Sequence, residues 1–212
     1  MSAPVASPGS AEAEAVPTGN TFDKYGSTNP LVRRLMGGFH SALDDLWERA
    51  EPRSVLDVGC GEGVLTEEWA ERLGERRIVG SDLDDEKLRA EWARRRRPNL
   101  EFRCEAATRL GFADDEFDMS AAIEVLEHVP EPEATVAEMA RVAERRLLVS
   151  VPREPLWRGL NVARGAYWRS LGTPTGHANH WSRRSFVELM SRHGKVEEAR
   201  SPFPWTMLLV RL

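Results

Sequence analysis

Strand-like and helix-like segments alternate along most of this chain, and the alternation restricts the possible fold more than any other feature. Five short segments have the length and apolar character of strands: SVLDVG, RRIVGSDL, NLEFRC, EFDMSAAIE and RRLLVSVP. Segments with helical spacing lie among them: VLTEEWAERL, DEKLRAEWARRRR and PEATVAEMARVA. A late helix, RRSFVELMSRHG, precedes two closing strands, KVEEARS and WTMLLVRL. This order predicts a doubly wound α/β domain, with a mainly parallel sheet of seven strands and helices on both faces.

The chain of 212 residues is most simply a single domain with a short tail. Residues 1–20 are small, acidic and rich in proline, a composition that predicts a disordered tail. The single domain then covers residues 21–212, with an N-terminal cap helix predicted within residues 21–51. Residues 153–181 form an insertion after the fifth strand that is rich in tryptophan and arginine. Its position predicts a lid that shapes the pocket for a substrate.

Charge and cysteine content disfavour several classes of protein. The formal net charge is −5 and the sequence pI is about 5.7, which argues against general affinity for nucleic-acid backbones. The two cysteines, Cys60 and Cys104, are too few for a disulfide framework and are typical of a reducing compartment. No apolar run is long enough to span a membrane, and the first residues lack the basic start and apolar centre of a secretory signal. We therefore expect a cytoplasmic protein.

The segment LDVGCGEGVL carries the sharpest functional signal. A strand ends near Asp57, and a loop with alternate glycines then leads into a helix, so backbone can approach a ligand at the carboxyl edge of the sheet. Asp82 ends the second strand and can accept hydrogen bonds from both ribose hydroxyls of an adenosine cofactor. A tight turn between strand and helix also needs glycine, so the loop alone does not decide between a ligand site and a structural turn.

The spacing of the loop narrows the choice of cofactor. A dinucleotide loop reads G-x-G-x-x-G, whereas this one reads G-x-G-x-G with acidic residues around it, which suit an ammonium or sulfonium cation better than a pyrophosphate. From Phe22 to Leu212 the chain resembles the class I S-adenosylmethionine-dependent methyltransferases, whose fold is Rossmann-like. The resemblance implies that S-adenosylmethionine is the cofactor and that Asp82 holds its ribose. It also implies that Leu83 packs against the adenine. The residues implied to form the loop around the cofactor's methionine are Asp57, Gly59, Gly61 and Gly63.

Two other parts of the predicted cofactor site follow from the same resemblance. In similar enzymes the first helix covers the cofactor, so Tyr25 is expected to line the site and Arg33 or Arg34 to meet the methionine carboxylate. Where many relatives have Gly-Asp-Ala before a Leu-Pro-Phe turn, this chain reads EAATRLGF. The contact to adenine then falls to Glu105 or to the backbone near Ala106.

The segment AAIEVLEHVPEPE places two carboxylates and a histidine at the end of the fourth strand. In the resembled fold this strand end lies beside the reactive methyl group, so Glu124 is expected to line the cofactor. His128 is a candidate general base that deprotonates a hydroxyl, with Glu124 or Glu127 orienting its ring. The alternative is that the whole turn only lines the cofactor pocket.

A metal site is a further interpretation of these residues. Two carboxylates and an imidazole are suitable ligands for Mg²⁺, Mn²⁺ or Zn²⁺. With the later segment GHANHWSRRSF, the pattern resembles that of the metal-dependent small-RNA 2′-O-methyltransferases, and its first part also resembles the ubiquinone-biosynthesis O-methyltransferases. The resemblance implies the ligands Glu124, Glu127, His128 and His177, with His180 as an alternative to His177.

Three functional classes remain open from the sequence. The favoured one is methyl transfer to a small molecule, most simply to the oxygen of a catechol or diol. An RNA ribose 2′-O-methyltransferase is the alternative, although net acidity and the lack of room for a separate RNA-binding domain count against a nucleic-acid partner. A non-catalytic cofactor-binding protein is the third class. Aromatic and arginine side chains in the insertion also suit peripheral contact with a lipid headgroup.

Overall fold

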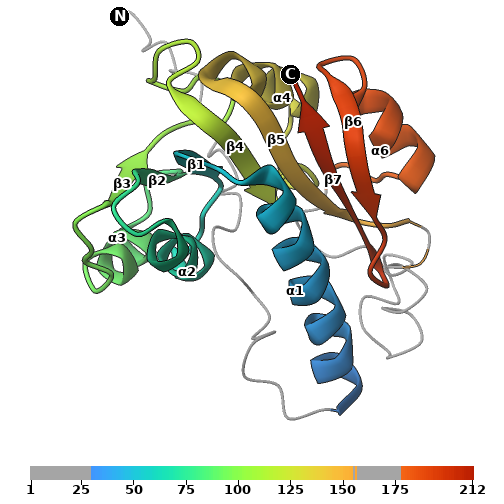
Figure 1. The fold of residues 1–212 in the computed structure, drawn as a ribbon, viewed down its shortest axis with the longest axis horizontal. Coiled ribbons are helices and arrows are strands. Elements are labelled where there is room, and N and C mark those ends of the chain that lie inside the picture. Colours follow the sequence, from blue (N-terminus) through green and yellow to red (C-terminus); the bar gives the residue numbers. More distant parts are fainter. Residues whose placement is uncertain (1–29, 155, 157–177) are drawn as a thin grey trace, which may run out of the picture.

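The structure, a computed structural model, describes residues 30–154, 156 and 178–212 (Figure 1). Its labelled helices are α1 (Pro30–Ala50), α2 (Val64–Leu73), α3 (Glu86–Trp92), α4 (Pro132–Val142) and α6 (Arg183–Met190). Its strands are β1 (Val55–Val58), β2 (Ile78–Asp82), β3 (Leu100–Cys104), β4 (Phe117–Ile123), β5 (Ala143–Pro152), β6 (Lys195–Arg200) and β7 (Trp205–Arg211). The predicted tail and most of the predicted lid lie outside the described residues.

The seven strands form one sheet in the order β3-β2-β1-β4-β5-β7-β6. Strands β1 to β5 run parallel to one another, and β7 is antiparallel to both β5 and β6. The predicted α/β fold with a mainly parallel, seven-stranded sheet is therefore confirmed. One boundary differs, because α3 ends at Trp92 and not near Pro98: the amides of Arg94 and Arg95 bond to carbonyls only three residues back, which closes the helix with a tighter turn.

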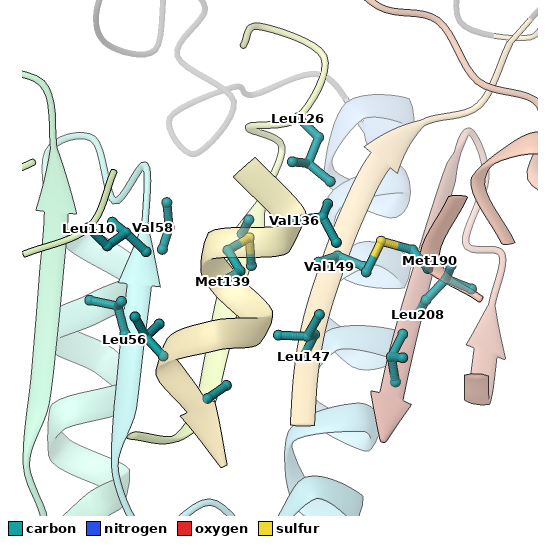
Figure 2. Packing of buried hydrophobic residues seen from close by; sticks show 14 of the residues in the cluster. Leu56, Val58, Leu110, Leu126, Val136, Met139, Leu147, Val149, Met190 and Leu208 are labelled. Carbon is teal, nitrogen blue, oxygen red and sulfur yellow. The ribbon is translucent and has the colours of Figure 1, made fainter. Parts of the chain in front are cut away.

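Helices cover both faces of the sheet because the buried strands are apolar on both sides. On one face, α4 and α6 pack against Leu56, Val58, Leu147 and Val149, as Figure 2 shows for part of this cluster. On the other face, α1 and α2 bury a second cluster that includes a stacked pair of tryptophans, Trp47 and Trp69, with ring centroids 4.6 Å apart. Successive side chains of β7 point to opposite faces of the sheet and so enter the two clusters in turn. Met207 and Leu209 lie in the cluster under α1 and α2, and Leu208 and Val210 lie in the other.

Helix α1 is the longest of the described helices. Its 21 residues span about 30 Å, and it ends at Ala50, just before β1 begins at the amino edge of the parallel strands. Its first turns therefore extend past the carboxyl edge of the sheet, as Figure 1 shows. Within the described part of the chain, no helix combines the length and the hydropathy needed to cross a membrane.

Candidate cofactor and acceptor site

Three glycines shape the loop that leaves β1 at the carboxyl edge. Gly59, Gly61 and Gly63 have φ values of 72°, 55° and 78°, which lie in the left-handed region that favours glycine. A Cβ at residue 59 would lie 2.6 Å from Val125, and one at residue 63 would lie 2.6 Å from the ring of Phe102. A Cβ at residue 61 would meet nothing within 4 Å. Two of the glycines therefore permit tight packing, while Gly61 leaves open space beside the loop.

Hydrogen bonds to β2 and α3 hold the loop in place. The amide of Gly59 donates a hydrogen bond of 2.7 Å to the carbonyl of Ser81, which links the loop to β2. The indole Nε1 of Trp92 donates to the carbonyl of Gly61 at 2.8 Å, and its ring stacks on Phe102 with 5.2 Å between centroids. No motif in the sequence marks Trp92 as part of the site. Its contribution follows from α3 lying beside the loop, which no local pattern indicates.

Asp57 is buried at the start of the loop. Its Oδ2 accepts a hydrogen bond of 2.7 Å from the Thr66 hydroxyl, which comes from the first turn of α2. Burial raises the pKa of Asp57 to about 7, and the nearby charge of Asp82 adds to the rise, while the Thr66 bond opposes it. A cation near this carboxyl would favour its ionised form.

This raised pKa predicts how stability depends on pH. Because the folded pKa of Asp57 lies above the ordinary value of 3.8, its stabilising contribution is complete below about pH 3.8 and is lost as pH rises through about 7. Relative to Asp57→Asn, we expect the free energy of unfolding of the wild-type protein to fall by about 2.5 kcal/mol between pH 5 and pH 8. Urea unfolding of both proteins at the two pH values measures the difference, and parallel pH profiles would contradict it.

Asp82 joins the loop to the end of β2. Its Oδ2 accepts from the amide of Gly61, and its Oδ1 accepts from the amide of Leu83, each at 2.7 Å. Burial raises the pKa of Asp82, although these two amide bonds act in the opposite direction. Each carboxylate oxygen keeps a second lone pair for a ligand hydroxyl. The side chain of Leu83, which is 46% exposed, offers an apolar surface next to this carboxylate.

The predicted adenine contacts begin one residue beyond β3. The amide of Glu105 donates to the carbonyl of Asp82 at 2.9 Å, so Glu105 lies beside the ribose-binding candidate. Its carboxylate accepts from the amide of Gly111 at 3.2 Å. Ala106 pairs with Arg109 in an isolated bridge that tightens the turn after β3. The roles of Glu105 and Ala106 toward a cofactor remain predictions.

Glu124 follows β4 directly and is fixed by two neighbouring strands. Its Oε1 accepts from the Ser150 hydroxyl at 2.9 Å, and its Oε2 accepts from the indole Nε1 of Trp205 at 2.7 Å. Its φ of 61° is unusual for a residue with a side chain, and such strain is found more often at functional sites than elsewhere. Both carboxylate oxygens are therefore engaged with β5 and β7 in this conformation.

Glu127 and His128 lie on the turn after Glu124. Glu127 is buried, whereas 43% of the His128 side chain is exposed. His128 Nε2 lies 3.9 Å from Glu127 Oε1, a distance at which the carboxylate stabilises a protonated imidazole. The pair therefore places an imidazole at the surface of the carboxyl edge, with a buried carboxyl group behind it.

The remaining predicted residues are only partly placed. Tyr25 and His177 lie outside the described residues, so their roles stay predictions. Arg33 is exposed in the first turn of α1. His180 Nδ1 lies 3.5 Å from Glu154 Oε1, which directs it toward the end of β5. In the described ranges, no group of three or more histidine, cysteine, aspartate or glutamate side chains could hold a metal ion.

A hollow of about 770 Å³ lies at the opposite edge of the sheet. Its lining includes Trp47, near the end of α1, and four arginines: Arg53, Arg72, Arg76 and Arg145. Three of these already pair with carboxylates, since Arg53 and Arg145 bind Asp118 and Arg72 binds Asp44 and Glu68. We therefore assign the functional site to the glycine loop and not to this hollow.

Comparison with known proteins supports the same assignment. Residues 56–146 match a family described as a methyltransferase domain. This matched region includes the glycine loop, Asp82 and the turn with Glu127 and His128. Over these residues the chain is therefore similar to a methyltransferase domain.

Individual relatives resemble this methyltransferase domain over part of their length. Demethylmenaquinone methyltransferase of Paenarthrobacter aurescens is 36% identical over 113 residues, which are 51% of this chain and 43% of that protein. Ubiquinone biosynthesis O-methyltransferase of Hahella chejuensis is 36% identical over 107 residues, 48% of this chain and 44% of that protein. The chain thus spans less than half the length of these relatives.

A solved structure supports the fold of the methyltransferase domain and its closing strands. Magnesium protoporphyrin IX methyltransferase from Synechocystis, with bound S-adenosylhomocysteine, superposes with a TM-score of 0.62. The match covers 88% of this chain and 89% of that one at 20% sequence identity. At this identity the likeness establishes the shared fold alone.

Proposed function

We propose that the protein binds S-adenosylmethionine at the glycine loop and transfers its methyl group to a hydroxyl of a small molecule. The observation that carries the proposal is the pairing of Gly61 with Asp82. The amide of Gly61 donates a hydrogen bond of 2.7 Å to the Asp82 carboxylate. A Cβ built on Gly61 would meet nothing within 4 Å, so the space beside this carboxylate is open. A ligand with vicinal hydroxyls can therefore approach both the backbone and a fixed acceptor.

The residues around this pair suit the parts of the proposed cofactor. Asp82 can accept from the ribose hydroxyls, and the exposed Leu83 side chain can cover one face of the adenine. Asp57 contributes negative potential at the other end of the loop, which favours a cationic ligand there. When bound, S-adenosylmethionine would supply a methyl group made electrophilic by its positively charged sulfur.

His128 is the proposed general base. Its imidazole would take the proton of the acceptor hydroxyl as that oxygen receives the methyl group that the cofactor would supply. The Glu127 carboxylate, 3.9 Å away, stabilises the imidazolium that forms. Glu124 plays a different part, because its carboxylate is held by Ser150 and Trp205 and so helps to fix the end of β4.

A small-molecule hydroxyl is the acceptor class that we favour. The name of one relative specifies O-methylation in ubiquinone biosynthesis, and this supports an oxygen acceptor of the catechol or diol type. The net charge of −5 disfavours RNA, because a polyanion gains affinity from positive protein charge.

The residues that the structure describes do not by themselves group into a metal site. Both carboxylate oxygens of Glu124 accept hydrogen bonds from β5 and β7, and His180 faces Glu154. We therefore derive no step through a metal ion. His177 lies outside the described residues, so the predicted set Glu124, Glu127, His128 and His177 stays a prediction for chelation to test.

Methyl-labelled S-adenosylmethionine with catechol as the probe acceptor tests the proposed function. We expect label to appear on a catechol oxygen, and we expect the same rate in buffer treated with EDTA. Loss of turnover in EDTA that Mg²⁺ or Mn²⁺ restores would contradict the base mechanism and support the metal set. Label transferred to an RNA oligonucleotide but to no catechol or diol would contradict the small-molecule acceptor.

A further inference from the structure

Asn179 fastens two distant segments together at the proposed site. It lies just before α6, about fifty residues along the chain from the turn after β4. Its side-chain Nδ2 donates to the carbonyl of Leu126 at 3.1 Å and to the carbonyl of Val129 at 2.6 Å. One amide group thus bridges both ends of the stretch that contains Glu127 and His128.

Backbone bonds strengthen the same contact. The amides of Ala178 and Asn179 both donate to the carbonyl of Glu127, at 2.8 Å and 3.1 Å. The turn therefore receives four hydrogen bonds from two consecutive residues. Because these bonds come from a distant segment, the local sequence of the turn does not determine its geometry.

The opposite side of this turn rests on the glycine loop. The amide of His128 donates to the carbonyl of Val125 at 2.9 Å, which closes the turn. The side chain of Val125 occupies the space that a Cβ at Gly59 would need, at 2.6 Å. Leu126 is fully buried in the core cluster. The turn is thus held between the loop on one side and Asn179 on the other.

We propose that Asn179 is a positioning residue that sets the place of Glu127 and His128 relative to the glycine loop. The functional part of this inference rests on the proposed methyl transfer, since it assigns the two residues to the acceptor side of that site. Loss of the amide leaves the carbonyls of Leu126 and Val129 without their donor. Asn179→Asp has nearly the same shape but turns a carboxylate toward two carbonyls, so the turn is expected to detach.

The chain contains a matched control in Asn99. Its Nδ2 also bridges two carbonyls, those of Ala70 and Arg76, at 2.9 Å and 3.0 Å. Asn99 directly precedes β3, so it lies at the amino edge of the sheet, away from the glycine loop. Asn99→Asp therefore removes the same kind of bridge without touching the proposed site.

Hydrogen exchange of the full chain, measured with and without S-adenosylmethionine, tests the proposal. In ligand-free Asn179→Asp, we expect the amides of residues 125–129 to exchange about tenfold faster than in the wild-type protein. We expect the slowing that the cofactor produces in this turn to be lost, while cofactor affinity stays within about threefold. Asn179→Ala should behave similarly, and Asn99→Asp should leave exchange in the turn unchanged.

Two results would overturn the positioning role. One is unchanged amide exchange in residues 125–129 of both Asn179 variants. The other is equal acceleration in Asn99→Asp, which would show a general loss of stability. If the wild-type protein binds no S-adenosylmethionine, the proposed function fails, but exchange of the ligand-free proteins still decides whether Asn179 holds the turn.

Discussion

Gly61→Val is expected to weaken S-adenosylmethionine binding by roughly 100-fold or more. The new side chain would project into the open space beside Asp82, where the cofactor is proposed to lie. The backbone at residue 61 has a φ of 55°, so valine also adds strain of about 1–3 kcal/mol to the loop. Because the amide of Gly61 donates to Asp82, any relaxation of the loop also moves the proposed ribose acceptor.

Gly74→Val supplies the control for backbone strain. Gly74 has a φ of 66° and, like Gly61, nothing within 4 Å of a Cβ. It lies at the other end of α2 from the glycine loop. Thermal unfolding reports the loss of stability in each variant, whereas calorimetric titration should show lost binding only in Gly61→Val. Equal affinities in the two folded variants would contradict the proposed location of the cofactor.

His128→Ala is expected to lower kcat for methyl transfer by about 10²- to 10⁴-fold, the range typical of a general base. The imidazole is the exposed proton acceptor beside buried Glu127, and alanine removes it without disturbing the core. The KM for S-adenosylmethionine should change little, because no proposed cofactor contact uses the imidazole. Initial rates of label transfer to catechol measure both constants.

His193→Ala is a suitable control for this variant, because His193 lies in the turn that follows α6. Its kcat should match that of the wild-type protein. The kcat of Glu127→Gln should lie between those of His128→Ala and His193→Ala. This substitution removes the charge that stabilises the imidazolium but leaves the base in place. A decrease of less than about tenfold in His128→Ala would contradict the base mechanism.

Local patterns in the sequence were sufficient to predict the strands, the glycine loop and the position of Asp82. The alternation of apolar and amphipathic segments is a short-range signal, and it indicated all seven strands and the parallel sheet. The positions of Gly59, Gly61 and Gly63 indicated the loop because only glycine adopts their backbone angles readily. Asp82 could be assigned to the same edge because parallel strands end together.

Contacts between distant segments could not be predicted in the same way. The bond from Trp205 to Glu124 joins residues 81 positions apart and depends on β7 lying next to β5. The bridge from Asn179 to the turn after β4 likewise depends on the path of the chain into α6. The sequence therefore did not indicate that Glu124 accepts a hydrogen bond from β7. It also did not indicate that Asn179, which belongs to no motif, contacts the turn at the proposed site.

Calorimetric titration of the wild-type protein and Asp82→Ala with S-adenosylmethionine tests the central claim most directly. We predict one binding site in the wild-type protein. Asp82→Ala should weaken binding by about 10- to 100-fold, because the ribose hydroxyls lose a charged acceptor and the amides of Gly61 and Leu83 lose their partner. No binding by the folded wild-type protein, or equal affinity in Asp82→Ala, would contradict the account.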